Sequence, residues 1–260
     1  MLGTEVSKVF RDAVKWDIEE LDVTSKKKVI DRITKLKPEL VINCSAYTDV
    51  DSCEDNRDFC FAINGEAVEY IAKACGMINA KLVHFSTDYV FDGKKIGYNE
   101  DDEPNPLNVY GESKYLGEIK LIENCKKYYL IRISWLYGRN GKNFIETILR
   151  VVKEKPYLEV VDDQIGNPTY AVDVANKIKE VLDKEYGIYH VTNSGHCSWY
   201  EYTKEILKLS NINKEVKPIQ SYQLNRKAKR PNYSILNNNK LKQMRSWQDA
   251  LKDYIKERAK

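Results

Sequence analysis

The sequence predicts an α/β protein with a Rossmann-like parallel sheet, helices on both faces of the sheet, and a smaller C-terminal substrate lobe. Short apolar runs bounded by polar residues are typical of buried parallel strands. Three such runs occur in the first half of the chain: Leu40–Cys44, Lys81–Ser86 and Tyr128–Ile133. Helical patterns separate these runs, and alternating strands and helices favour a parallel sheet covered on both sides. With 260 residues, the chain is long enough to bury the core of such a fold.

The helices of the first half are predicted from apolar spacing and from loop composition. Apolar residues recur at helical spacing over residues 59–75, and Gly76 follows as a C-terminal cap. A loop rich in Pro, Asn, Asp and Glu, residues 99–108, then leads into a helix that carries Tyr110 and Lys114.

Beyond about Gly138 the pattern changes to amphipathic helices, one strand and polar loops. We predict helices over residues 143–153, 173–182, 199–209 and 247–257, and a strand over residues 187–191. Residues 212–239 are polar and punctuated by Pro and Asn, as in a lobe built from loops over a cleft. We therefore predict a main domain over residues 1–138, joined by 167–193, and a smaller lobe over 139–166 and 194–260.

The charge balance excludes some classes of partner. The formal net charge is only +3, which argues against nucleic acid or membrane lipid as the main partner. The densest basic run, Arg226–Arg230, is short, and fits either a solvated loop or a site for an anionic ligand.

Cysteine and histidine usage predicts a cytoplasmic protein without a metal site. The six cysteines include no Cys-x-x-Cys pair, and the three histidines are widely spaced in sequence. We find no signal peptide and no apolar stretch near the ~20 residues that cross a bilayer. Reduced, mostly buried thiols are the interpretation, with disulfides or zinc as the alternative.

The most informative motif is Tyr110-Gly111-Glu112-Ser113-Lys114, which follows Ser86-Thr87-Asp88-Tyr89 at the end of a predicted strand. Residues four apart on a helix share a face, so Tyr110 and Lys114 can point into one pocket. A cation beside a phenol lowers the pKa of the phenol, and such a tyrosine can give a proton to a carbonyl oxygen. Taken alone the spacing is a weak signal, because lysine-rich helices contain it by chance.

Polar or aromatic groups follow three of the predicted strands where each strand ends. These groups are Asn43–Ala46, Ser86–Asp88 and Ser134–Trp135. Ligands of open α/β sheets bind outside the carboxyl ends of the strands, so this edge is the predicted site.

Six ordered motifs closely resemble one family. They are Val41–Thr48, Ser86–Gly93, Pro106–Lys114, Arg132–Gly138, Asp163–Thr169 and Lys229–Ser234. The chain resembles the dTDP-4-dehydrorhamnose reductases, which are extended short-chain dehydrogenases/reductases, from Leu2 to near its C-terminus.

The resemblance implies a dinucleotide-binding main domain and a sugar-nucleotide-binding lobe. It also implies reduction of the C4 ketone of dTDP-4-dehydro-L-rhamnose to dTDP-L-rhamnose, with NADPH or NADH as cofactor. Tyr110 is the implied proton donor, Lys114 holds the nicotinamide ribose, and Thr87 hydrogen-bonds the carbonyl oxygen. A dTDP-sugar is the implied partner, and a homodimer is one expectation.

The resemblance also assigns binding positions. Those that match the cofactor site are Leu2, Gly3, Asp22, Val23, Ala46, Tyr47, Thr48 and Phe85, together with Tyr110 and Lys114. Those that match the substrate site are Thr87, Asp88, Tyr89, Trp135 and Arg230, whose guanidinium suits a diphosphate.

Structural alternatives exist for several of these residues. Tyr110 and Lys114 could form a surface pair, Thr87 could cap a turn, and Trp135 could belong to the core. Asp22 could cap a helix through the stretch Asp22–Ser25.

The N-terminus departs from the family pattern. Nucleotide-binding folds of this type begin with a strand and a glycine-rich turn at a helix N-terminus. Gly3 falls where the last glycine of that turn is expected, without the first strand and the earlier glycines, and residues 11–20 look short for a second strand. We expect the natural coding sequence to begin upstream of Met1; if Met1 is the true start, cofactor affinity should suffer.

Other functions of related proteins remain as alternatives. Sugar-nucleotide dehydratases and epimerases share the implied fold, but dehydratases carry Asp-Glu after the threonine, where this chain has Asp88-Tyr89. The regulatory subunit of methionine adenosyltransferase also resembles these reductases and acts by binding its partner. The intact set Thr87, Tyr110 and Lys114 favours catalysis over that role.

Overall fold

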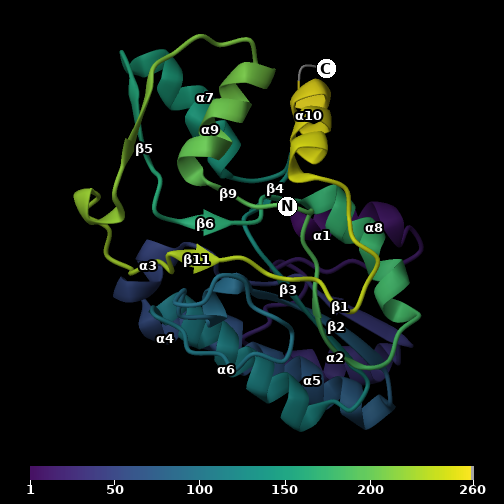
Figure 1. Ribbon diagram of the computed structural model, residues 1–260. Helices are drawn as coiled ribbons and strands as arrows, with labels where there is room; N and C mark the ends of the chain where they lie inside the picture. Colours follow the sequence, from purple (N-terminus) through teal and green to yellow (C-terminus); the bar gives the residue numbers. More distant parts are fainter. Residues whose placement is uncertain (259–260) are drawn as a thin grey trace.

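The computed structural model describes residues 1–258 and confirms the predicted α/β class. Four strands form the main sheet: β1 (Leu40–Asn43), β2 (Lys81–Thr87), β3 (Tyr128–Ile133) and β8 (Gly187–His190). They lie in the order β1-β2-β3-β8, and every neighbouring pair is parallel. Because all four run the same way, their carboxyl ends meet at one edge of the sheet (Figure 1).

Helices cover both faces of this sheet, as predicted. One face packs on α1 (Leu2–Val9) and α8 (Ala171–Leu182), and the other on α2 (Lys26–Leu36), α5 (Ala67–Ile78) and α6 (Val109–Asn124). Successive residues of β2 show why: Leu82 belongs to the core beneath α5, and Val83 belongs to the core beneath α8. Strands buried on both faces need continuous apolar sequence, which is the pattern that predicted them.

The helix predicted over residues 59–75 is longer and is capped elsewhere. Helix α4 (Arg57–Phe61) continues through a π-helical turn, Ala62–Glu66, into α5. The prediction that Gly76 ends this helix is wrong, because α5 runs to Ile78 and Asn79 takes the left-handed conformation with φ of 59°. Asparagine tolerates this conformation better than most residues do, so it replaces glycine as the cap.

The N-terminal segment contributes helices rather than strands. Leu2–Val9 is helical, and residues 11–20 form turns. Within residues 1–258 no strand precedes β1, so β1 lies at the edge of the sheet.

The second half of the chain builds a separate set of short elements above the sheet (Figure 1). These elements are β4 (Leu136–Tyr137), α7 (Phe144–Glu154), β5 (Leu158–Val161), β6 (Ile165–Gly166), β7 (Thr169–Tyr170), β9 (Cys197–Ser198), α9 (Trp199–Leu209), β10 (Val216–Ile219), β11 (Tyr233–Ser234) and α10 (Trp247–Arg258). The prediction of α9 matches its bounds, since Ser198 and Glu201 form a capping box at its start. The polar stretch 212–239 is mostly loop, but it contains β10 and β11.

One short helix lies between β1 and α4 in the chain. Helix α3 (Val50–Asp55) follows the loop after β1 and contacts both α4 and α6. Asp49 caps it by accepting a hydrogen bond from the Ser52 N–H at 3.1 Å.

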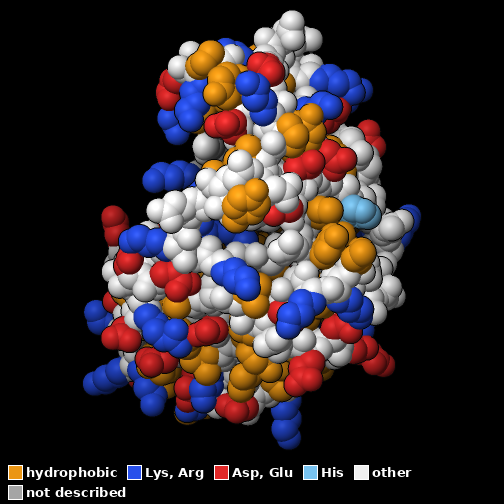
Figure 2. All heavy atoms as spheres, turned by 60° about the vertical axis from the view of Figure 1, so that its left-hand side comes forward, with side chains coloured by type: hydrophobic (Ala, Val, Ile, Leu, Met, Phe, Trp, Pro, Cys, Tyr) orange, Lys and Arg blue, Asp and Glu red, His pale blue; other side chains and the backbone are white. Residues whose placement is uncertain are grey.

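Charged side chains of both signs lie on the surface. Positive and negative side chains are interspersed over the face in Figure 2. Among the described helices, none has the length and apolarity needed to span a bilayer. Residues 1–258 also contain no group of three or more His, Cys, Asp or Glu side chains placed to hold a metal ion.

Candidate active site

Helix α6 begins beside the end of β2 because two side chains cap it there. Asn108 accepts a hydrogen bond from the Gly111 N–H at 2.8 Å, and Glu54 of α3 accepts one from the Val109 N–H at 3.0 Å. A Cβ atom at Gly111 would lie 2.2 Å from the carbonyl oxygen of Tyr89, so glycine allows the helix this close to the strand end. The predicted helix therefore starts one residue before Tyr110, next to Thr87 and Tyr89.

Lys114 is buried, and its side chain reaches the carboxyl-terminal part of β2. Its Nζ donates a hydrogen bond to the carbonyl oxygen of Phe85 at 2.6 Å, and the residue is only 2 % exposed. Burial lowers the pKa of Lys114 to about 8, although the nearby Glu118 acts in the opposite direction. Lys114 therefore remains protonated up to mildly alkaline pH.

Tyr110 lies at the end of β2 with its ring against Tyr89. The two rings meet edge to face, with centroids 5.9 Å apart. Burial is the largest influence on Tyr110 and raises its pKa, while a hydrogen bond with the Thr87 side chain favours the phenolate. The expectation that the cation at Lys114 lowers the pKa of this phenol is not met in this structure, because burial outweighs every group that favours the charged form.

Asp88 joins the end of β2 to two other segments. Its carboxylate accepts hydrogen bonds from Thr87 Oγ1 at 2.9 Å and from Ser134 Oγ at 2.8 Å. Burial raises its pKa to about 6, against the effect of bonds to Ser234, Ser134 and Thr87. Asp88 thereby fixes the Thr87 hydroxyl next to Tyr110 and ties β2 to β11.

Trp135 follows β3 in a conformation held by its neighbours. Its φ of 44° is unusual for a large side chain, and its ring stacks on Trp199 with centroids 3.4 Å apart and planes 5° apart. A Cβ atom at Gly166 would lie 2.5 Å from the Trp135 ring. The residue is partly buried and packs against the apolar core around α7, α9 and α10.

Arg230 is held by a carboxylate of α3. Its Nη1 and Nη2 atoms donate to the two oxygens of Asp51 at 2.7 and 2.9 Å. Arg226 also pairs with Asp51, at 3.1 Å, and Lys227 pairs with Asp55. Ion pairs with Asp51 and Asp55 therefore hold the basic run Arg226–Arg230 against α3.

The loop after β1 is positioned by Asn64, which the sequence argument missed. Its side chain accepts from the Tyr47 N–H and donates to the Tyr47 carbonyl oxygen, both at 2.9 Å, and it also donates to Ser113 Oγ at 3.0 Å. Asn64 is fully buried and lies in the π-helical turn. In the sequence, the signal was an amide within the apolar pattern of residues 59–75. Ala46 and Thr48, on either side of Tyr47, are exposed.

The other predicted cofactor positions lie in different places. Leu2 and Gly3 begin α1, and Gly3 lies near Cys44 just after β1. Asp22 is exposed and accepts hydrogen bonds from the N–H and the hydroxyl of Thr24, so its structural role as a turn residue is present. Val23 is partly buried against the core beneath α2.

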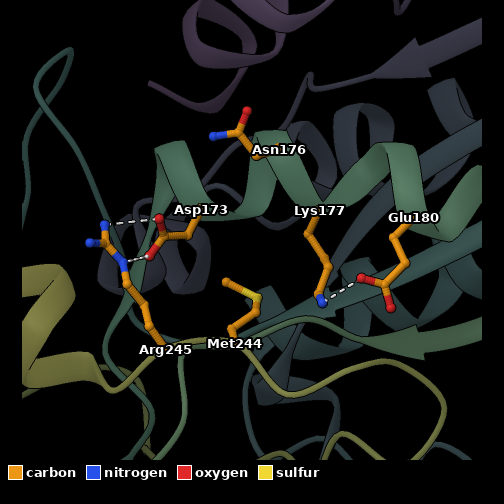
Figure 3. Close-up of a pocket in the computed structure, with 6 residues that line it drawn as sticks. All are labelled: Asp173, Asn176, Lys177, Glu180, Met244 and Arg245. Atoms are coloured by element: carbon orange, nitrogen blue, oxygen red, sulfur yellow. Dashed lines mark hydrogen bonds and ion pairs between the residues drawn. The ribbon is translucent and has the colours of Figure 1, made fainter.

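The hollow drawn in Figure 3 lies away from this edge of the sheet. Its volume is about 280 Å³, and it is formed by α8 and the segment before α10. Its charged groups already pair with one another, Arg245 with Asp173 and Lys177 with Glu180 (Figure 3). We therefore locate the candidate site at Thr87, Tyr110 and Lys114.

These observations define a class of protein. A parallel sheet covered on both faces, with a hydroxyl at one strand end and a Tyr-x-x-x-Lys helix beside it, defines a Rossmann-like protein of the short-chain dehydrogenase/reductase type.

Comparison with known proteins places the chain within that class. The family model described as the RmlD substrate binding domain matches residues 1–260, and the chain belongs to this family. A curated relative, the dTDP-4-dehydrorhamnose reductase of Aggregatibacter actinomycetemcomitans, is 37% identical over 276 residues, covering 97% of this chain and 94% of the relative. The spore coat polysaccharide biosynthesis protein SpsK of Bacillus subtilis is 41% identical over 228 residues, covering 86% and 81%.

Solved structures agree with this placement. A dTDP-4-dehydrorhamnose reductase from Clostridium acetobutylicum aligns with a TM-score of 0.96 and 38% identity, covering 100% of this chain and 96% of that one. The enzyme of the same name from Bacillus anthracis, in complex with NADP, aligns with a TM-score of 0.91 and 38% identity, covering 97% and 95%. The expected resemblance is thereby confirmed.

Proposed function

We propose that this protein is an NAD(P)H-dependent reductase that converts the C4 ketone of dTDP-4-dehydro-L-rhamnose into the alcohol of dTDP-L-rhamnose. The observation that carries the proposal is that Tyr110 lies beside Thr87 at the carboxyl end of β2, while Lys114 Nζ donates to the Phe85 carbonyl oxygen of the same strand. Relatives of known name at 37% and 38% identity along nearly the whole chain support the same activity.

The donors at this edge fit a nicotinamide cofactor. Among the described residues, Lys114 Nζ has one hydrogen-bond partner, the Phe85 oxygen, so its other N–H groups suit a ribose diol. The Tyr47 backbone, fixed by Asn64, and the start of α1 at Leu2 and Gly3 complete the proposed cofactor surface. When bound, the reduced nicotinamide supplies the hydride.

The chain's own residues handle the proton and the developing charge. Tyr110 gives its phenolic proton to the C4 oxygen, which suits a phenol that burial keeps protonated. The Thr87 hydroxyl, which donates to Asp88 in this structure, turns its proton to the C4 oxygen and stabilises the negative charge that develops there. The Lys114 ammonium lowers the cost of the phenolate that remains.

We also propose that the sugar nucleotide lies between the main domain and the C-terminal lobe, with the boundaries predicted above. Asp88, Tyr89, Trp135 and Arg230 are the proposed contacts. A separate apolar core around α7, α9 and α10 supports the two-part division. Arg230 can turn its guanidinium from Asp51 to a diphosphate, because both partners present two oxygens to a planar fork.

Replacement of Tyr110 by Phe tests the proposal. We expect Tyr110→Phe to lower the turnover of dTDP-4-dehydrorhamnose by about 10²–10⁴-fold, the usual contribution of a general acid. The matched control is Tyr115→Phe on the same helix, which removes a hydroxyl outside the proposed site. Circular dichroism checks that both variants fold, and near-normal turnover by a folded Tyr110→Phe variant would remove Tyr110 from the mechanism.

A further inference from the structure

Two buried cysteines lie in contact behind the candidate active site. Cys53 is on α3 and Cys60 is on α4, and their sulfur atoms are 2.8 Å apart. Both residues are fully buried and both are free thiols in this structure. Two sulfurs at this separation need to move by less than 1 Å to reach the ~2.05 Å bond length of a disulfide.

Polar groups around the pair favour a thiolate at Cys60. Its sulfur contacts Ser113 Oγ at 3.1 Å and accepts from Asn64 Nδ2 at 3.3 Å. Contact with Cys53, hydrogen bonds with Ser113 and Asn64 and the charge of Lys114 lower the pKa of Cys60, against the effect of burial. The same contact and burial raise the pKa of Cys53, which favours Cys60 as the more acidic thiol of the pair.

Helix α3 connects this pair to three parts of the proposed active site. Asp51 holds Arg230, Glu54 accepts from the first N–H of α6, and Cys53 lies between them on the same helix. On the other side, Cys60 contacts Asn64 and Ser113, and Asn64 positions Tyr47. A change in the bonding of the two sulfurs therefore acts on groups that place the catalytic helix, the proposed cofactor loop and the proposed substrate arginine.

We propose that Cys53 and Cys60 form a reversible disulfide on exposure to a hydroperoxide, and that this modification slows the reductase. The Cys60 thiolate attacks the peroxide O–O bond, which breaks to give a sulfenic acid and release water or an alcohol. The Cys53 thiol then attacks the sulfenic sulfur, so that the S–S bond forms and a second molecule leaves as water. The two thiols lose two electrons and the hydroperoxide gains them, and a dithiol reductant reverses the change.

The local fold allows this chemistry in spite of burial. Helix α3, which carries Cys53, has only six residues, and such a short helix opens at low cost in free energy. Hydrogen peroxide is small enough to enter through such openings. Once oxidised, Cys60 carries no charge beside Lys114 and offers no thiol to Ser113 and Asn64.

Peptide mapping tests the modification without any enzyme assay. Trypsin cuts after Arg57, which places Cys53 and Cys60 in different peptides, residues 36–57 and 58–73. After treatment with hydrogen peroxide we expect these peptides to be linked, with the loss of two hydrogens. Because Cys44 shares the first peptide, fragmentation must locate the bond at Cys53. The absence of this link, at a peroxide concentration that oxidises surface methionines, would overturn the proposal.

The effect on turnover is measured on the same samples. The modification rests on geometry alone, whereas the slowing rests on the proposed function. We expect a loss of about tenfold or more on oxidation, since small displacements of positioning groups have large effects on rate, and recovery with dithiothreitol. Cys53→Ala and Cys60→Ser should each be insensitive to peroxide relative to their own untreated activity, and the control Cys197→Ser should respond like the wild type. A linked protein with unchanged turnover overturns the switch, and a reduced protein without any reductase activity overturns the proposed function instead.

Discussion

The buried ion pair between Glu118 and Arg132 provides a test that joins stability to catalysis. Arg132 Nε and Nη2 donate to the two Glu118 oxygens at 3.0 and 2.7 Å, and both side chains are 2 % exposed. Glu118 lies on α6 and Arg132 on β3, so the pair fastens the catalytic helix to the sheet. Glu118 also stabilises the positive charge of Lys114, one turn earlier on the same helix.

Glu118→Gln keeps the shape of the side chain and removes its charge. The Arg132 guanidinium then stays buried without a counter-charge, and its partners are the neutral amide of the variant, the Glu100 carbonyl oxygen at 3.2 Å and the face of Phe91. An uncompensated buried charge costs about 3–5 kcal/mol of unfolding free energy. At ~2–4 °C per kcal/mol for a chain of this size, the melting temperature should fall by about 6–20 °C.

The same substitution should change the pH dependence of turnover. The pKa of Lys114 is about 8 with Glu118 present, and loss of that carboxylate lowers it further. A lysine with a lowered pKa loses its proton earlier as pH rises, so the alkaline decline of kcat should begin at lower pH. Urea unfolding followed by circular dichroism and a pH–rate profile measure the two effects.

Glu123→Gln is the matched control. Glu123 lies on the same helix, pairs with Lys120 at 3.4 Å, and is 54% exposed, so its loss should cost less than about 1 kcal/mol. The double variant Glu118→Gln/Arg132→Met should recover part of the stability, because it removes the stranded charge. Equal stability of Glu118→Gln and Glu123→Gln, or an unmoved alkaline limb, refutes the reasoning.

Two further predictions concern burial at the site. The pKa of Asp88 is raised from 3.8 to about 6, so between these values the native state binds a proton that the unfolded chain releases. The stability of the wild type should therefore fall by about 3 kcal/mol, relative to Asp88→Asn, as the pH rises through this window. Urea unfolding at pH 4 and pH 7 measures this difference. Gly117→Ala should lower the unfolding free energy by about 1–3 kcal/mol, because its Cβ would lie 2.2 Å from the Asn64 carbonyl oxygen, whereas Gly3→Ala, with ordinary contact distances, should change stability little in the same assay.

Local patterns were sufficient to predict the strands of the main sheet and several of the helices. The apolar runs at β1, β2 and β3 and the capped helix α9 appear where the sequence places them, because burial on both faces and capping boxes leave a mark in consecutive residues. Helix α5 shows the limit of prediction from local patterns. Its left-handed cap is Asn79 and not the predicted Gly76, and either residue type can take that conformation.

The motifs also placed the candidate site at one edge of the sheet. Tyr110 lies beside Thr87 there, and Lys114 reaches the Phe85 carbonyl oxygen of the same strand, because parallel strands end together and helix neighbours four apart share a face. The protonation of these groups was not predictable in the same way. Spacing suggested a lowered tyrosine pKa, but desolvation depends on every atom packed around the ring, and these atoms come from distant segments.

The sequence by itself determined the α/β class and the order of the motifs along the chain, and it supplied the side chains proposed to react. Only the tertiary structure decided which partners those side chains have: Asn64 with Tyr47, Asp51 with Arg230, and Cys53 with Cys60. The physical reason is range. Periodicity, caps and strand ends arise from residues within a few positions of one another, whereas hydrogen bonds and ion pairs such as that of Asp51 and Arg230 join positions far apart in the chain, and packing alone brings those together.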